Sequence, residues 1–251
     1  MSRLFDGIDD YLTKASAIFS NRLGAFPAYD AYNITLAAWV RPNDKHDGII
    51  MGADDGSTND ERFCIWSRSV GRFALRSKSS YIQTPDKDYD NSNTAWFHVA
   101  GTLEYDSRAL YVNGVAEATG SATHQLDMSG ADNFYIGRDR TGRYWDGAIA
   151  EAAAYIIALS AGEISSLAAG VSPLLVRPEA LIGYWPLGGA YTANDADTDI
   201  VGGHALTDSG SPTGEDHPPI FYPASSPTLY VPAVGGQATR AMHHYRMLRC
   251  S

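Results

Sequence analysis

Aromatic and polar side chains that could hold a sugar occur in two parts of the chain. A sugar ring packs its C–H face on an aromatic ring, while Asp, Asn and Arg side chains hydrogen-bond to its hydroxyls. Tyr144 and Trp145 flank a turn just before Gly147. The alternative is that these rings pack in the core or across a hairpin. The candidate residues for a glycan-binding surface are Trp66, Tyr81, Arg138, Asp139, Arg143, Tyr144 and Trp145.

Motifs that support catalysis are scarce in the sequence. It contains no His-Glu-x-x-His metal motif, no Gly-x-Ser-x-Gly nucleophile motif and no phosphate-binding loop. Asp195-Ala-Asp-Thr-Asp199 begins like an EF-hand calcium loop, but Ile200 replaces the required Gly and Leu206 replaces the bidentate Glu. His98 is expected to be a packed, hydrogen-bonded histidine. The residues alone therefore indicate a protein that is not an enzyme and that requires no cofactor.

The composition disfavours several classes of protein. Charged residues make up 19% of the chain and the net charge is −10, which is the wrong balance for a nucleic-acid-binding protein. An aromatic content of 11% is too high for a disordered chain. No uncharged apolar run of about 18 residues is present, so no membrane-spanning helix is expected, and the first residues lack a secretion signal. Two cysteines, Cys64 and Cys250, are too few for a disulfide framework, and we expect free thiols.

The elements that would position these side chains are predicted to be short antiparallel strands. Asn113-Gly114 is typical of the type I′ turn of a β-hairpin, here over residues 109–117. Ser160 and Glu163 form a capping box, which predicts one short helix over 161–169 that ends at Gly170. Trp39, Trp96 and Trp185 are assigned to the core. Strands are predicted over 34–42, 47–53, 62–66, 72–76, 96–103, 133–138, 148–158 and 181–187.

Seven segments of the chain together resemble one known family. The order in which they follow one another matches the laminin-G-like, concanavalin-A-like jelly roll. The resemblance implies an all-β fold in which two antiparallel sheets pack face to face as a sandwich. The segments are Phe5-Asp-Gly-Ile-Asp-Asp-Tyr-Leu12, Ile34-Thr-Leu-Ala-Ala-Trp-Val-Arg-Pro42, Trp96-Phe-His-Val-Ala-Gly-Thr-Leu103, Leu110-Tyr-Val-Asn-Gly-Val115, Tyr135-Ile-Gly137, Gly147-Ala-Ile-Ala-Glu151 and Ala158-Leu-Ser-Ala-Gly-Glu-Ile164.

The chain departs from the family in the order of its last strands. A strand resembling Gly183-Tyr-Trp-Pro-Leu187 usually comes first in the family, whereas here it comes late. We therefore expect residues 1–172 to form the jelly roll and residues 173–210 to complete the same sandwich in permuted order. A small second domain is the alternative. Residues 211–251 are predicted to form an extended, Pro-rich and basic tail that makes assembly contacts.

The resemblance also implies one structural calcium site at Asp9 and Asp10. In calcium-binding relatives, carboxylates and carbonyls near this turn ligate one ion, and calcium prefers such hard oxygen ligands. The family's usual Asp is replaced by Ala150 here, which weakens the transfer of that site. The alternative is an Asp-rich turn whose side chains satisfy its own backbone.

Three functions follow from these expectations. The leading hypothesis is a non-enzymatic structural protein of a bacteriophage virion surface, as capsid decoration or tail component, that also contacts host glycans. Its partners would be copies of itself or other virion proteins, bound through the tail, with no nucleic acid or membrane involved. The second is a carbohydrate-binding, lectin-like module of a bacterial protein. The third is a glycoside hydrolase, which is disfavoured because Ala109 stands where the family's third carboxylate would follow Glu104-Tyr-Asp106.

Overall fold

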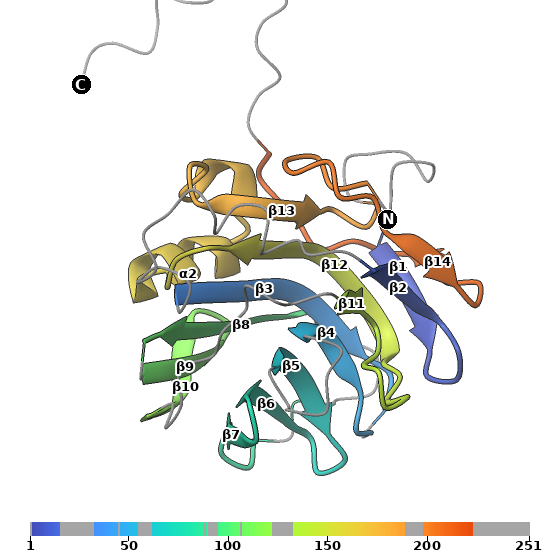
Figure 1. Cartoon of the computed structure of the whole chain (residues 1–251), viewed down its shortest axis with the longest axis horizontal. Helices are drawn as coiled ribbons and strands as arrows, with labels where there is room; N and C mark the ends of the chain where they lie inside the picture. Colours follow the sequence, from blue (N-terminus) through green and yellow to red (C-terminus); the bar gives the residue numbers. More distant parts are fainter. Residues whose placement is uncertain are drawn as a thin grey trace, which may run out of the picture.

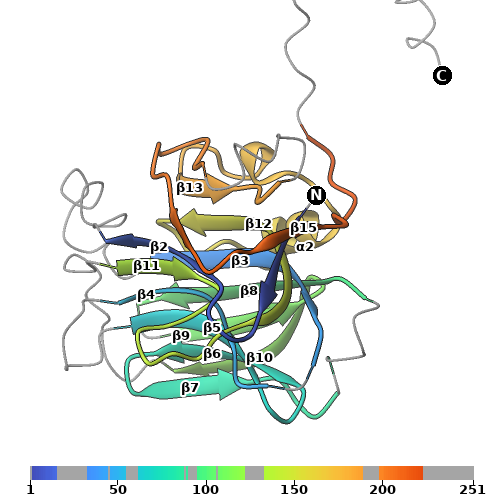
Figure 2. The same cartoon turned by 90° about the vertical axis from the view of Figure 1, so that its right-hand side faces the viewer.

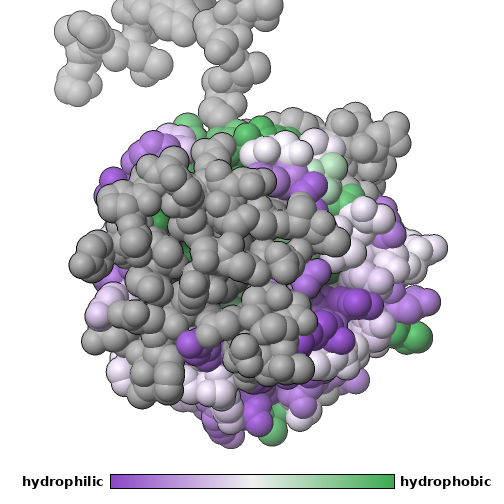
Figure 3. All heavy atoms as spheres, in the orientation of Figure 1, coloured by the Kyte–Doolittle hydropathy of each residue, from purple (hydrophilic) through white to green (hydrophobic). Residues whose placement is uncertain are grey.

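The protein is a sandwich of two antiparallel sheets, as predicted (Figure 1). The hydrophobic core lies between the sheets and includes the stacked rings of Phe134 and Trp185, whose centroids are 4.7 Å apart. The surface seen in Figure 3 is mainly hydrophilic over the described residues. The computed structural model describes residues 2–15, 33–44, 46–54, 62–87, 89, 95–105, 107–121, 133–188 and 198–222.

The eight-stranded sheet has the strand order β10-β9-β8-β3-β12-β1-β15, and β13 also pairs with β12. Its central strand β3 has apolar residues on both faces because one face lines the core and the other is largely covered. Its strands are β1 (Ser2–Asp6), β3 (Asn33–Pro42), β8 (Phe97–Glu104), β9 (Ser107–Val112), β10 (Val115–Ser121), β12 (Asp146–Tyr155), β13 (Leu181–Trp185) and β15 (Thr213–Glu215).

The seven-stranded sheet has the strand order β14-β2-β11-β4-β5-β6-β7. Its outer face, which points away from the core, carries the polar and aromatic residues of β5, β6 and β7. Its strands are β2 (Tyr11–Ala15), β4 (Ile49–Asp54), β5 (Arg62–Arg68), β6 (Arg72–Ser77), β7 (Ser80–Gln83), β11 (Asn133–Ile136) and β14 (Thr207–Ser209).

Local turn and cap signals are confirmed. Asn113 and Gly114 have φ angles of 50° and 81°, which are the two positive values that a type I′ turn needs between β9 and β10. The single α-helix described, α2 (Ala161–Ala168), begins with the reciprocal Ser160–Glu163 capping box. A short 3₁₀ helix, η2 (Pro173–Leu175), follows it. No helix in the described ranges is long and apolar enough to cross a membrane.

Strands that follow η2 pair within both sheets (Figures 1 and 2). β13 pairs with β12, β14 pairs with β2, and β15 pairs with β1. The buried carboxylate of Asp199 joins the segment after β13 to that strand, because it accepts hydrogen bonds from the amides of Tyr184 and Val201. These contacts support the proposal that residues 173–210 complete the same sandwich, which a shortened chain tests below. β15 lies in the segment expected to be tail and pairs with β1 instead.

Residues 216–222 run from β15 to the region after α2. The amide of Phe221 donates to the carbonyl of Gly170 at 2.7 Å, and the amide of Ser172 donates to the carbonyl of Phe221 at 3.1 Å. The Tyr222 hydroxyl donates to the buried carboxylate of Glu151 at 2.7 Å. The expected Pro-rich extension is therefore described as far as Tyr222, and the remaining tail, with Cys250, lies outside the described residues. Cys64 is a buried free thiol, as expected.

Two of the three tryptophans assigned to the core are only partly buried. Trp185 is fully buried, as predicted, but Trp39 and Trp96 are at intermediate exposure. Trp39 lies on the outer face of the eight-stranded sheet because its neighbours Ala38 and Val40 point into the core. The ring of Trp96 lies under the guanidinium of Arg41, with 5.3 Å between the Arg41 Cζ and the ring centroid.

Candidate functional site

One cluster of predicted sugar-binding residues lies on the outer face of the seven-stranded sheet. Trp66 on β5 and Tyr81 on the edge strand β7 meet edge to face, with ring centroids 5.4 Å apart. Ala74 of β6 is the cross-strand neighbour of Trp66, and its small side chain leaves room for the two rings above it. Trp66 is 5% exposed and Tyr81 is 47% exposed. Trp66 therefore supports the ring of Tyr81, which is the one presented to solvent.

Polar groups surround the exposed ring of Tyr81. The guanidinium of Arg68 lies over it, with Cζ 5.3 Å from the ring centroid. The same guanidinium donates to Oε1 of Gln83 and to the Tyr81 hydroxyl. No carboxylate pairs with Arg68 among the described residues, so its charge is not neutralised there. We name Trp66, Arg68, Tyr81 and Gln83 the Tyr81 platform; sequence reasoning found its two aromatic residues but missed Arg68 and Gln83.

Asp139 organises the loop between β11 and β12 and is not free to bind a sugar. Its Oδ1 accepts hydrogen bonds from the amide and hydroxyl of Thr141, and its Oδ2 pairs with Arg143. Arg62 lies 3.6 Å from the same Oδ2. Burial would raise the pKa of Asp139, but the hydrogen bonds from Arg143 and Thr141 hold that pKa below its usual range. Asp139 and Arg143 were both candidates for sugar binding, but in the structure they form an ion pair with each other.

Arg138 and Tyr144 come together with an aromatic residue that the sequence did not single out. The Arg138 Cζ lies 3.7 Å from the ring centroid of Tyr11 and 5.9 Å from that of Tyr144. Tyr11 comes from β2, which pairs directly with β11. The only sequence signal for Tyr11 is its place at the end of the Phe5-Asp-Gly motif. The three side chains form a second cationic and aromatic surface, which we name the Arg138 stack.

Trp145 does not belong to either surface, which corrects its assignment as a sugar-binding candidate. Its side chain is fully buried in the main core. Its ring lies 5.4 Å from the ring of His46, and its amide donates to the carbonyl of Gly137 at 2.7 Å. The turn that begins at Gly137 thus directs Trp145 inward while its neighbour Tyr144 stays partly exposed.

The acidic turn before β2 brings Asp6, Asp9 and Asp10 together, with candidate ligand atoms within 4.8 Å of one another. Oδ1 of Asp6 accepts the amides of Ile8 and Asp9, and the hydrogen bond from Ile8 is the main reason that the pKa of Asp6 is lowered. The two carboxylate oxygens of Asp10 accept the amides of Asp6 and Ser211. Within the described part, the Asp9 carboxylate keeps both oxygens uncommitted.

This arrangement fits calcium only in part. Calcium takes about six to eight oxygen ligands. Three of the six carboxylate oxygens of the turn already accept backbone amides, so water and main-chain carbonyls would have to supply much of a coordination sphere. Calcium at Asp9 and Asp10 therefore stays a prediction, and the contacts of Asp10 explain its burial without an ion.

Glu104 and His98 have no catalytic arrangement around them. Glu104 ends β8 at an exposed position, and Tyr105, with a φ of 51°, turns the chain toward β9. Asp106 lies outside the described residues. His98 is buried beside Trp39, with ring centroids 5.5 Å apart, and burial lowers its pKa to about 3. His98 is packed as predicted, but its Nδ1 makes no hydrogen bond to the described residues.

The comparisons with known proteins agree with this fold. A family model described as the Concanavalin A-like lectin/glucanases superfamily matches residues 9–165, more than half of the chain. No curated protein matches. A putative carbohydrate binding protein from Bacteroides ovatus is similar, with a TM-score of 0.59 and 19% identity over 88% of this chain and 61% of that one.

Two further solved structures share the architecture. A heptameric SAP-like pentraxin from Limulus polyphemus has a TM-score of 0.51 and 19% identity, over 66% of this chain and 81% of its own. The CBM40 module of the Ruminococcus gnavus IT-sialidase, solved with α2,3-sialyllactose, has a TM-score of 0.50 and 17% identity, over 67% and 97% respectively. At these identities the likeness concerns the fold.

Proposed function

The chain belongs to the Concanavalin A-like lectin/glucanases superfamily, and on that premise we propose that it is a non-catalytic glycan-binding module. The observation that supports this most is the Tyr81 platform. It combines a half-exposed aromatic ring, a guanidinium without a carboxylate partner among the described residues, and an amide side chain. These are the groups that a sugar needs for C–H packing and for hydrogen bonds to its hydroxyls.

The platform is held in place before any ligand arrives. Trp66 packs against one side of the Tyr81 ring, and Arg68 is fixed by Gln83 and by the ring itself. A ligand therefore loses little affinity to the ordering of these side chains. Preorganised aromatic and polar groups of this kind are typical of specific binding surfaces.

The charge of the surface favours acidic glycans. Neither Arg68 nor Arg138 has a carboxylate partner among the described residues, and each guanidinium lies over a tyrosine ring. Arg binds carboxylates in a bidentate manner through its planar fork. A sialic acid or uronic acid carboxylate is the group that such a site would select. The sialylated ligand of the Ruminococcus gnavus module supports testing this class first.

Catalysis is not part of the proposal. Glycoside hydrolysis requires a facing pair of carboxylates about 5 to 9.5 Å apart across the scissile bond. Glu104 lies at a strand end, and the clustered carboxylates of Asp6 and Asp10 accept backbone amides.

The virion-surface hypothesis stays an untested prediction. It depends on family resemblance and on an assembly contact by the tail, and residues 223–251 lie outside the described part of the chain. None of the contacts described here favours it over a glycan-binding module. The lectin-like alternative is therefore the function that we carry forward.

A glycan array tests the proposal. The wild-type protein should bind acidic glycans, and Arg68→Gln should lose most of that signal. Arg72→Gln is the matched control, because Arg72 lies on the same sheet but pairs with Asp86 at 3.0 Å. An array without acidic hits, or equal loss of signal in the two variants, would exclude the platform as an acidic-glycan site.

A further inference from the structure

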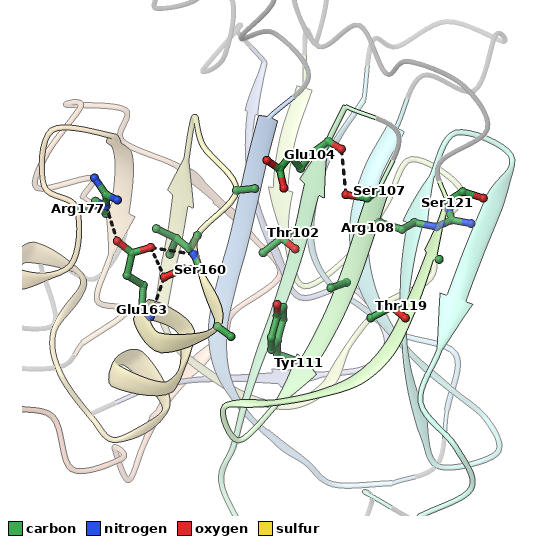
Figure 4. Close-up of a pocket in the computed structure, with 15 residues that line it drawn as sticks. Thr102, Glu104, Ser107, Arg108, Tyr111, Thr119, Ser121, Ser160, Glu163 and Arg177 are labelled. Carbon is green, nitrogen blue, oxygen red and sulfur yellow. Dashed lines mark hydrogen bonds and ion pairs between the residues drawn. The ribbon is translucent and has the colours of Figure 1, made fainter.

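A groove of about 730 Å³ lies on the outer face of the eight-stranded sheet, where β8, β9 and β10 meet the beginning of α2 (Figure 4). This volume is within the usual range for small-ligand sites. The groove is on the opposite sheet from the Tyr81 platform, and none of the predicted sugar-binding residues lines it.

Two hydroxyls on the floor of the groove lack partners in the protein. Thr102 of β8 and Tyr111 of β9 are only 6% and 9% exposed. Neither hydroxyl makes a hydrogen bond to another described residue, and both side chains rise from the sheet into the groove (Figure 4). Neither hydroxyl oxygen is among the buried polar atoms without a partner, so both open into the groove, where water satisfies them in the free protein. A ligand with donors and acceptors would replace that water with direct hydrogen bonds.

The two cationic side chains of the lining, Arg177 and Arg108, are both held by other groups of the protein. At the beginning of α2, the Glu163 carboxylate accepts the amide of Ser160 at 2.8 Å and forms an ion pair with Arg177. The guanidinium of Arg108 is turned toward β7, where it donates to the carbonyl and the hydroxyl of Ser80 at 3.0 Å. Arg177 is therefore neutralised by Glu163, whereas Arg108 has no carboxylate partner among the described residues but directs its guanidinium toward β7 rather than into the groove.

One carboxylate and further hydroxyl side chains add to the lining. Glu104 stands at the end of the groove, and its side chain has no hydrogen-bond or ion-pair partner in the described ranges. Thr119 and Ser121 line the opposite wall from the edge strand β10. Ala109, Leu159 and Gly120 lie between the polar groups and offer small apolar surfaces.

This lining identifies the chemistry of the occupant. The unpaired carboxylate of Glu104 faces the groove and no guanidinium is directed into it, an arrangement that disfavours phosphates, uronates and sialates. Hydroxyl side chains both donate and accept hydrogen bonds, as sugar hydroxyls do, and a carboxylate accepts from two adjacent hydroxyls. We propose that the groove binds an uncharged oligosaccharide, so that one outer face of the sandwich selects acidic glycans and the other selects uncharged ones. The assignment of the groove does not depend on the Tyr81 platform.

Calorimetric titration with short, unsubstituted gluco-, galacto-, manno- and xylo-oligosaccharides tests this proposal. Thr102→Val and Tyr111→Phe remove one floor hydroxyl each and keep the size of the side chain. Each should weaken binding of the best oligosaccharide by about ten-fold, which corresponds to one lost hydrogen bond of about 1.4 kcal/mol. The thermal midpoint should not fall, because neither hydroxyl has a partner within the described fold.

Tyr81→Ala is the control, and it should leave the affinity for uncharged oligosaccharides unchanged. The groove proposal is overturned if none of the four classes binds, or if Thr102→Val and Tyr111→Phe both bind as the wild type does. Binding that is lost in Tyr81→Ala instead would place uncharged sugars on the platform. That result would overturn the groove proposal while leaving the glycan-binding function in place.

Discussion

Phe134 and Trp185 stack at 4.7 Å between the two sheets, and they come from strands on opposite sides of the core. Phe134 belongs to β11, and Trp185 belongs to β13, which follows α2 in the chain. The indole Nε1 of Trp185 also donates to the carbonyl of His204 at 2.9 Å. The last strands therefore contribute a central part of the core and do more than cover its edge.

A chain that ends at Gly170 should not unfold cooperatively like the whole protein. It loses Trp185 and leaves the edge of β12 unpaired where β13 was bound. Urea unfolding followed by tryptophan fluorescence measures this. Trp185→Ala in the full chain is the milder test, with an expected loss of about 4 kcal/mol in the free energy of unfolding. A cooperative transition of unchanged midpoint in the shortened chain would show that residues 171–251 form a separate unit.

Asp199→Ala should destabilise the protein by about 3 kcal/mol. The buried carboxylate accepts hydrogen bonds from the amides of Tyr184, Val201 and His204, and removing it leaves these donors without a partner. Chemical denaturation compares it with Asp208→Ala, whose exposed side chain pairs with Arg3 and should cost less than about 1 kcal/mol. Equal effects of the two substitutions would contradict the structural role of Asp199.

The calcium prediction at Asp9 and Asp10 is tested by the melting temperature. An ion that binds only the folded state stabilises it by mass action, so a chelator should lower the midpoint and added calcium should restore it. Asp9→Asn should abolish this dependence without changing the backbone contacts of Asp10. A midpoint that does not respond to calcium would leave the turn as a self-satisfied Asp cluster.

His98 should make the stability depend on pH. Burial lowers its pKa from 6.5 to about 3, so between these values the unfolded chain binds a proton that the folded protein does not. Stability is therefore complete above about pH 6.5 and falls as the pH drops, by up to about 1.4 kcal/mol per unit. Urea titrations at several pH values should show a shallower slope for His98→Leu than for the wild type. Parallel slopes would mean that His98 is protonated in the folded protein.

Much of the fold could be predicted because its signals are local. The Asn113-Gly114 turn and the Ser160–Glu163 cap each need only a few adjacent residues, and both are present. The burial of a tryptophan on a strand cannot be predicted from adjacent residues in this way, because it depends on which face of the sheet packs against the second sheet. For this reason Trp39, assigned to the core, is only partly buried, and Trp145, a candidate for the surface, is fully buried.

The residues that form the candidate sites were harder to predict from the sequence. Tyr81 meets Trp66 across β6, and Arg138 meets Tyr11 across more than a hundred residues of chain. The groove takes its floor from β8 and β9 and its walls from β10 and α2, and no short motif carries that arrangement. Such surfaces follow from strand register, which hydrophobic alternation alone does not specify between distant strands.

The most direct test of the glycan-binding proposal is a calorimetric titration of Tyr81→Ala with the best acidic oligosaccharide from the array. Tyr105→Ala is the control, because Tyr105 is equally exposed but lies in the turn between β8 and β9. Loss of the stacking ring should weaken binding by about ten-fold or more, while Tyr105→Ala keeps the wild-type affinity. Wild-type affinity in Tyr81→Ala would contradict the account.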